Sequence, residues 1–286
     1  MASKSLFSRG IQPDPRPDLL VDENPDGKGV GPWVPKDKHR LLTDYLHGTR
    51  NAWKSFPKRV LIDPFCGPGR IRVAGETATR DGGAVTAWRE MHNDATPFTS
   101  VFVGDLDPDK APACAARLQA MGADARAFVG PAAETVPQMV AAVPRGALCM
   151  AYVDPYCLNL LDFEMLRTLA ILKVDLAVHF STMDLQRNVI IDLADERDNF
   201  EKVAPGWKSS VDFKTTGVTN IRVAFFEFWR RQLVSLGFNY SREMPIVYNT
   251  QGAAMYRLVF FARHDMPLRV WGDVAKPKNR DLFAEE

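Results

Sequence analysis

The chain has 286 residues, of which 46% are hydrophobic and 25% charged, and its formal net charge is +1 at pH 7. This length suits one large or two small domains, and the balanced charge excludes the global basic field that marks many nucleic-acid binders. The first ten residues have no apolar core of signal-peptide length, and no apolar run approaches a membrane span, so we expect a cytoplasmic protein without membrane contact. The four cysteines lack metal-type spacing and are too few for a disulfide framework, so no metal site is predicted and a reducing compartment fits: Cys66, Cys114, Cys149 and Cys157.

Residues 1–32 are rich in Pro, Asp and Gly and show little periodicity, which predicts an irregular N-terminal arm. A helix with apolar positions such as Leu41, Tyr45 and Trp53 follows. Between positions 36 and 59 there are seven basic and two acidic residues, a local charge of +5. Such a run is typical of a solvated helix face. The alternative is a phosphate-contacting patch, in which Lys38 is a candidate substrate-binding residue.

The functional interpretation depends most on residues 60–70, a short apolar run that ends in Asp63 and passes into a loop with Gly67 and Gly69. This pattern is typical of a buried parallel strand that leads into a ligand-binding loop. The two glycines let a ligand approach the main chain. A second apolar strand follows and ends in Asp105. An acid at the tip of the second strand, beside the glycine loop of the first, suits the two hydroxyls of a ribose, so the pair predicts a nucleoside-containing cofactor.

The remaining pattern alternates between helices and strands. Helices are predicted at 83–91, 111–122, 136–143, 163–172, 184–196, 221–236 and 270–275, and strands at 101–105, 125–129, 147–153, 174–180, 244–248 and 255–262. Residues 249–252 are predicted to join the last two strands as an antiparallel hairpin. The stretches at about 70–82 and 198–220 are predicted insertions, and the second is a candidate lid or substrate-binding segment.

This order predicts an α/β fold with a Rossmann-like, doubly wound sheet of the class I methyltransferase type, mostly parallel with a C-terminal antiparallel hairpin. One such domain is expected over residues 33–276, with a tail at 277–286. Because ligands of these sheets bind outside the carboxyl ends of the strands, the strand-end acids should meet at one crevice. The expected cofactor is S-adenosylmethionine.

Within that crevice, Asp63 is expected to face the methionine part of the cofactor and Asp105 to hold the ribose hydroxyls. Asp107 competes for the ribose, or else it caps the next helix. The other cofactor-binding candidates lie in the loop: Phe65, Gly67 and Gly69. In many methyltransferases an acid near the end of the third strand meets the adenine amine, but residues 130–133 read Gly-Pro-Ala-Ala, which weakens that contact.

The turn Asp154-Pro155-Tyr156, after the apolar fourth strand, is the predicted catalytic group. The Asp154 carboxylate and the Pro155 carbonyl can accept from a substrate amine and aim its lone pair at the methyl group, and Tyr156 can stack on a planar substrate. Methyltransferases that act on exocyclic base amines use a similar Asp/Asn-Pro-Pro-aromatic turn. Here there is a single proline and the aromatic residue comes one place early. The alternative is a strand-ending aspartate that caps a turn.

Three further residues have more than one possible role. Cys157 suggests the cysteine nucleophile of enzymes that methylate carbon five of pyrimidines, although Tyr156 separates it from the proline. His179 lies inside an apolar strand, where a core histidine is expected. Arg187, after the fifth strand, is a candidate contact for a substrate phosphate or carboxylate, or else it pairs on the helix surface.

These residues together resemble the three-Cys-motif partner (TcmP) family, bacterial proteins of methyltransferase-like fold. The features that match, over about residues 33–275, are Trp33 with Lys38-His39 and Tyr45-Leu46, the run from Ile62 to Gly69, Asp154-Pro155-Tyr156, Asp184-Leu185 with Arg187, and Phe260-Phe261-Ala262 leading to His264 and Trp271. Cys157 stands where a glycine is commoner in the family. The resemblance implies a partner with a three-cysteine motif, similar to iron-sulfur radical enzymes, and it leaves the substrate open.

The main hypothesis is a methyltransferase that uses S-adenosylmethionine and methylates a nitrogen of a nucleic-acid base. The alternative is a non-catalytic adaptor of the same fold, which acts with nucleic acid or with the iron-sulfur partner. A dinucleotide oxidoreductase is disfavoured because the chain has no extended Gly-x-Gly-x-x-Gly.

Overall fold

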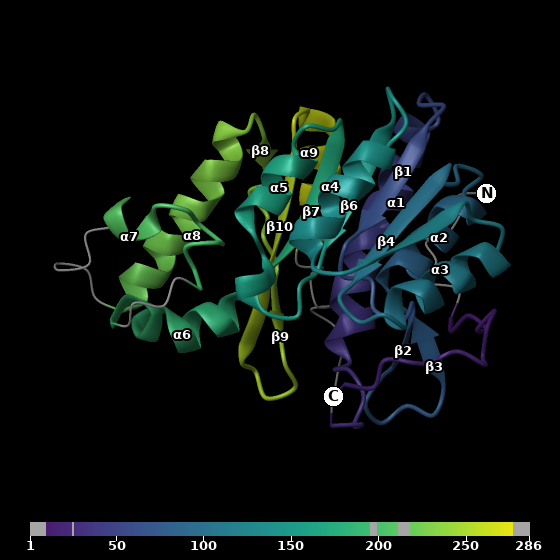
Figure 1. Cartoon of the computed structure of the whole chain (residues 1–286), viewed down its shortest axis with the longest axis horizontal. Helices are drawn as coiled ribbons and strands as arrows, with labels where there is room; N and C mark the ends of the chain where they lie inside the picture. Colours follow the sequence, from purple (N-terminus) through teal and green to yellow (C-terminus); the bar gives the residue numbers. More distant parts are fainter. Residues whose placement is uncertain (1–9, 25, 195–198, 211–217, 277–286) are drawn as a thin grey trace, which may run out of the picture.

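Eight strands form the central sheet of the computed structural model, which describes residues 10–24, 26–194, 199–210 and 218–276 (Figure 1). Their order is β5-β4-β1-β6-β7-β10-β8, and β9 pairs with β10 beside this path. The strands are β1 (Arg59–Asp63), β4 (Ser100–Asp105), β5 (Ala125–Val129), β6 (Leu148–Val153), β7 (Val174–Ser181), β8 (Asn239–Tyr240), β9 (Ile246–Tyr248) and β10 (Ala254–Ala262). The first five of the path run parallel, and β10 is antiparallel to β7, β8 and β9.

The predicted fold class is confirmed by this strand order. The chain moves from β1 outward to β4 and β5, and then returns to the other side of β1 with β6 and β7. The switch point, where a doubly wound sheet binds its ligands, therefore lies between the carboxyl ends of β1 and β6. The predicted closing hairpin is present as β9 and β10, in which Tyr248 pairs with Ala254.

Two boundaries at the C-terminal end differ from the prediction. The two-residue strand β8 was not predicted, because Asn239 and Tyr240 are too few to show an alternating pattern. The last helix, α9 (Asp265–Ala275), begins five residues earlier than expected. Pro267 lies in the first turn of this helix, where a proline is tolerated.

Helices cover both faces of the sheet, and the alternation of side chains along each strand divides the core into two layers. One layer packs against α1 (Arg40–Trp53), α2 (Gly83–Asn93), α3 (Lys110–Ala120) and α9. The other packs against α4 (Ala132–Ala142), α5 (Phe163–Leu169), α6 (Thr182–Ala194), α7 (Trp207–Ser210) and α8 (Val218–Ser235). In β1, Leu61 faces the first layer while Val60 and Ile62 face the second. Short turns of helix precede α1 and α5, namely the π-helix η2 (Val34–His39) and the 3-10 helix η3 (Leu158–Leu160).

The N-terminal arm and the first predicted insertion form one small unit at the edge of the domain (Figure 1). Within the insertion, β2 (Arg70–Arg72) and β3 (Thr79–Asp81) pair as an antiparallel hairpin. The arm adds single bridges from Asp22 to Ile71 and from Val30 to Val73. Residues 1–9 of the predicted arm lie outside the described residues.

The Arg117 side chain fixes this unit to α3. It is fully buried, and it donates to the carboxylate of Asp14 at 3.0 and 3.1 Å. It also donates to four main-chain carbonyls, those of Arg16, Leu19, Leu20 and Pro68. Because Pro68 belongs to the glycine loop, one guanidinium ties the arm, the loop and α3 together.

The described residues of the second predicted insertion pack into the core. Phe200 and Trp207 are buried and contact Phe225 of α8 with ring centroids 5.5 and 4.9 Å apart. Residues 211–217 and 195–198 lie outside the described residues, and the lid role of this segment stays a prediction. Among the helices of the described residues, none has the length and apolar character needed to cross a membrane.

Candidate active site

Three strand-end acids lie at the carboxyl edge of adjacent parallel strands. Asp63 ends β1, Asp105 ends the neighbouring β4, and Asp154 follows β6 on the other side. In the registers Asp63 pairs with Val103, two residues before Asp105, and Ile62 pairs with Ala151, three residues before Asp154. The three acids therefore lie at the same edge of the sheet, and their sharing of one crevice stays a prediction.

The glycine loop is held against Asp105 by its backbone. Gly67 donates its N–H to Asp105 Oδ2 at 3.0 Å and has φ of +56°, and Gly69 has φ of +76°. A Cβ added at Gly69 would lie 2.9 Å from Cys114 Sγ and 3.1 Å from Cys114 Cα, closer than real Cβ contacts. Both the positive φ and the close helix require glycine at this position.

Asp105 is half-buried, and its other oxygen, Oδ1, accepts from the N–H of Asp107 at 2.9 Å. Asp107 in turn accepts from the N–H of Asp109 at 3.0 Å, in the turn before α3. Asp105 therefore faces the glycine loop, as its predicted role requires. Asp107 does not cap α3, whose N-cap residue is Asp109 without a side-chain cap, and the ribose role of Asp107 stays a prediction.

Asp63 is almost completely buried, with 1% exposure, beneath the loop. Its Oδ1 accepts from the N–H of Phe65 at 3.1 Å, and a Cβ at Gly83, where α2 begins, would lie 3.6 Å from Oδ2. Burial raises the pKa of Asp63 well above its usual value, and the charges of Asp154 and Asp105 add to this effect. A cationic ligand group beside Asp63 would favour the ionised carboxylate. The Phe65 side chain is half-buried against the core layer of α4 and α5.

Asp154 lies at the centre of a buried polar cluster. The ammonium of Lys38 in η2 donates to both carboxylate oxygens, at 2.6 and 3.0 Å. The Tyr152 hydroxyl donates at 3.4 Å, and His179 Nδ1 lies 3.5 Å away. Burial alone would raise the pKa of Asp154, but the neighbouring His179 and Lys38 outweigh burial and the pKa is lowered. Asp154 is thus an anion that can accept from an amine.

Lys38 is 5% exposed, so it does not belong to a solvated helix face, and its role in substrate binding stays a prediction. Its Nζ sits 3.9 Å from the centre of the Tyr256 ring in β10, a cation–π contact. The neighbouring His39 is also buried, and burial lowers its pKa to about 4, so its imidazole is neutral at pH 7. Burial likewise lowers the pKa of His179 to about 3.

The other two residues of the predicted catalytic turn differ in burial. Pro155 is buried, while Tyr156 is 76% exposed and presents its ring to solvent beside Asp154. Cys157 is half-buried and its thiol donates to Asn159 Oδ1 at 2.7 Å, and burial raises the pKa of this thiol. A raised pKa disfavours the thiolate that a cysteine nucleophile needs. Arg187 is exposed on α6, the helix whose Asp184 accepts from the N–H of Leu158 at 2.9 Å and so holds the turn.

Several groups of the predicted basic run make contacts within the chain. Arg40 pairs with Asp44 at 2.9 Å, and Arg59 donates to the carbonyl of Pro97 at 2.8 Å. Lys58 donates to the carbonyl of Arg145 at 3.3 Å. These contacts favour the solvated-face interpretation of the run for those side chains.

Three residues of the cluster were missed as site residues by sequence reasoning, namely His39, Tyr152 and Tyr256. The sequence could have placed Tyr152 beside Asp154, because residues two apart on a strand share a face and Asp154 follows Tyr152 by two residues. His39 follows Lys38 directly. Tyr256 had none, since its place depends on the pairing of β10 with β7.

A cavity of about 490 Å³ lies at the opposite, amino edge of the sheet. Its lining is mostly apolar and includes Trp53, Phe56 and the pair of Tyr45 and Asp175, whose side chains are hydrogen-bonded at 2.7 Å. It is therefore separate from the three strand-end acids, and in a doubly wound sheet the ligand binds at the carboxyl edge. We place the candidate active site at the acids and not in this cavity.

Asp175 in this cavity should make stability depend on pH. Burial raises its pKa to about 6 from 3.8, so the folded chain binds the proton more tightly than the unfolded chain does. The resulting stabilisation is complete below the unfolded pKa and is lost as the pH rises through about 6. We expect the unfolding free energy of the wild type, relative to Asp175→Asn, to fall by roughly 2 kcal/mol between about pH 4 and pH 7. Urea unfolding of both proteins across this range measures it, and a constant difference would contradict the prediction.

No family model matches the chain, and no curated protein matches it. Solved structures show a distant likeness. A protein of Legionella pneumophila has a TM-score of 0.46 and 7% identity, covering 82% of this chain and 89% of that chain. An O-methyltransferase from Bacillus cereus, in complex with SAH, has a TM-score of 0.41 and 8% identity, covering 79% and 80%. A proposed RNA methyltransferase from Pyrococcus horikoshii has a TM-score of 0.39 and 11% identity, covering 85% and 91%. The assignment of the fold rests on the strand order of the chain itself.

Proposed function

We propose that the protein is a methyltransferase that uses S-adenosylmethionine and transfers the methyl group to an amino nitrogen of a nucleic-acid base. The observation that carries this proposal is the joint placement of the Asp105-bound glycine loop and the anionic Asp154 at one switch point. The first is suited to a nucleoside, and the second to an amine beside it.

The cofactor would lie over the glycine loop. Asp105 would accept from the ribose hydroxyls, and Asp63 would face the cationic methionine part, which would offset the cost of ionising this buried acid. The bound cofactor supplies an electrophilic methyl group on a sulfonium. The chain itself orders the loop, because Gly67 and Asp105 are already hydrogen-bonded.

The acceptor amine would compete with the Lys38 ammonium for the Asp154 carboxylate. An exocyclic amine that donates a hydrogen bond to Asp154 would have its lone pair aimed at the methyl group. The exposed Tyr156 ring can stack on the base. Asp154 or water would take up the proton that the amine loses on methylation. A displaced Lys38 and the exposed Arg187 are the candidate phosphate contacts.

A second candidate function is the non-catalytic adaptor. The observation that favours it is the Lys38–Asp154 ion pair, which fills the acceptor position with a group of the chain's own. In that case nucleic acid, or the iron-sulfur partner implied by the resemblance to the TcmP family, would be bound without methyl transfer. Cofactor affinity separates the two functions, because an adaptor has no need to keep it.

The cofactor half of the proposal is tested by calorimetric titration with S-adenosylmethionine and S-adenosylhomocysteine. We expect saturable binding in the wild type and a roughly 10- to 100-fold weaker affinity in Asp105→Ala, which loses charged hydrogen bonds to the ribose. Asp107→Ala is the matched control, two residues away, and should bind normally. Absent binding in the wild type would overturn the proposal. Equal losses of cofactor affinity in both variants would contradict a specific role of Asp105 in binding the ribose.

The acceptor half is tested with methyl-labelled cofactor and mixed RNA and DNA, followed by digestion to nucleosides. Label on an exocyclic base nitrogen is the expected product. Cofactor binding without label in any nucleic acid would favour the adaptor.

A further inference from the structure

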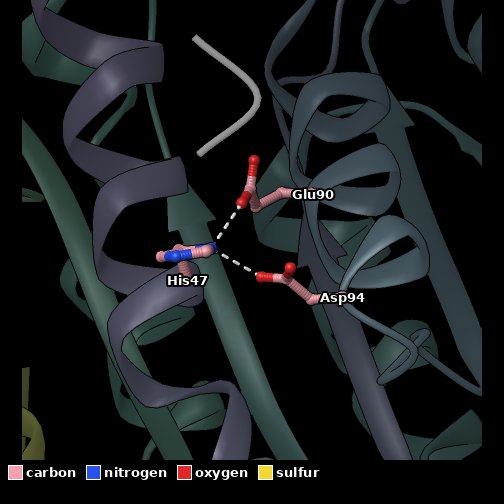
Figure 2. A group of neighbouring side chains, drawn as sticks. All are labelled: His47, Glu90 and Asp94. Carbon is pink, nitrogen blue, oxygen red and sulfur yellow. Dashed lines mark hydrogen bonds and ion pairs between the residues drawn. The ribbon is translucent and has the colours of Figure 1, made fainter. Parts of the chain in front are cut away.

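Three metal-ligating side chains converge between α1 and α2, away from the strand-end acids (Figure 2). His47 projects from α1 toward Glu90 of α2 and Asp94, the C-cap residue of α2 (Figure 2). Its Nδ1 lies 3.0 Å from Glu90 Oε1 and 2.6 Å from Asp94 Oδ2. All three ligand atoms lie within 4.8 Å of one another.

The spacing of this group is close to that of a coordination sphere. A metal ion about 2.1 Å from each ligand separates adjacent ligand atoms by about 3.0–3.4 Å. The contacts of 3.0 and 2.6 Å from Nδ1 require side-chain shifts of less than about 1 Å to reach this range. Glu90 lies in the last turn of α2, and Asp94 is the C-cap residue whose N–H donates to the carbonyl of Glu90, so the two residues lie one turn apart at the end of the helix.

Burial distinguishes the group from ordinary surface acids. The side chains of Glu90 and Asp94 are 0% and 1% exposed, while the His47 side chain is 19% exposed. Two buried carboxylates meet at a single imidazole nitrogen, and the guanidinium of Arg50 is 3.8 Å from Asp94. A divalent cation in place of the shared proton would neutralise both carboxylates at once.

We propose that His47, Glu90 and Asp94 bind a divalent first-row transition-metal ion. One imidazole nitrogen and two carboxylate oxygens suit Zn²⁺, with water completing the coordination. The ion would replace the proton on His47 Nδ1, which leaves to solvent. It would cross-link α1, which continues from the Lys38-bearing η2, to α2, which begins beside Asp63. The inference does not depend on the proposed function.

The test uses the full, untagged chain after dialysis against a chelator. We expect calorimetric titration with ZnCl₂ to show one equivalent bound, and CoCl₂ to develop the visible absorption of protein-bound Co²⁺. The melting temperature should rise on addition of Zn²⁺. His47→Gln, Glu90→Gln and Asp94→Asn should each weaken Zn²⁺ binding by about 100-fold or more, since each removes one of only three protein ligands.

Two matched variants control for nonspecific effects. His92→Gln removes the exposed histidine two residues from Glu90, and Asp44→Asn removes an acid of α1, and both should bind Zn²⁺ as the wild type does. Glu90→Gln keeps the side-chain volume, so its fold can be checked by circular dichroism before titration. Failure of the wild type to bind one equivalent, or binding that survives both His47→Gln and Glu90→Gln, would overturn the proposal and leave the group as an ion-paired cluster.

Discussion

Replacing Arg117 by alanine is expected to lower the free energy of unfolding by about 3–5 kcal/mol, the range for breaking a buried ion pair from one side. The guanidinium is fully buried and holds the Asp14 carboxylate together with four carbonyls from the arm and the glycine loop. Without it, these acceptors lose their shared donor and the arm loses its anchor on α3. Chemical denaturation monitored by circular dichroism measures the change.

The control is Arg16→Ala, which removes an exposed ion pair of the same arm and should change stability little. Arg117→Ala should also weaken cofactor binding, because Arg117 donates to Pro68 and Asp22 Oδ2 lies 3.7 Å from the Cβ position of Gly67. A stability loss below about 1 kcal/mol would show that water replaces the guanidinium and that the arm is not anchored by it.

Asp154→Asn is expected to lower kcat for methyl transfer by about 10²–10⁴-fold while leaving the affinity for S-adenosylmethionine within about threefold. The amide keeps the shape of the side chain but loses the negative charge for which the acceptor amine and Lys38 compete. Single-turnover transfer of labelled methyl groups, with calorimetry for the cofactor, separates the two effects.

Asp162→Asn is the matched control for this prediction. Asp162 accepts from the N–H of Glu164 as the N-cap of α5, and asparagine caps equally well, so both activity and binding should persist. Undiminished methyl transfer by Asp154→Asn would show that Asp154 has no role in the reaction. Loss of cofactor binding in the same variant would instead assign it to the cofactor site.

The sequence predicted those parts of the site that follow from local rules. Asp63 and Asp105 could be placed together because parallel strands bring their carboxyl ends to one edge, and Gly67 and Gly69 marked the loop between them. The Lys38–Asp154 pair joins residues 116 positions apart, and no local pattern announces it. The role of Arg117 was hidden for the same reason, since a basic residue on a helix is usually a surface residue. Trp207 was placed in an irregular excursion because its burial depends on α8, which follows it in the chain.

The union of the arm with α3 also sets an order of events during synthesis. Asp14 leaves the ribosome 103 residues ahead of its partner Arg117. At about 5–20 residues per second of synthesis, roughly 5–20 s therefore pass between the synthesis of Asp14 and that of Arg117. During that interval the hairpin of β2 and β3 is made while the arm still lacks its anchor on α3. The arm can dock only after α3 has formed, so a bulky group placed beside the arm would slow this docking step although the arm is translated before its partner.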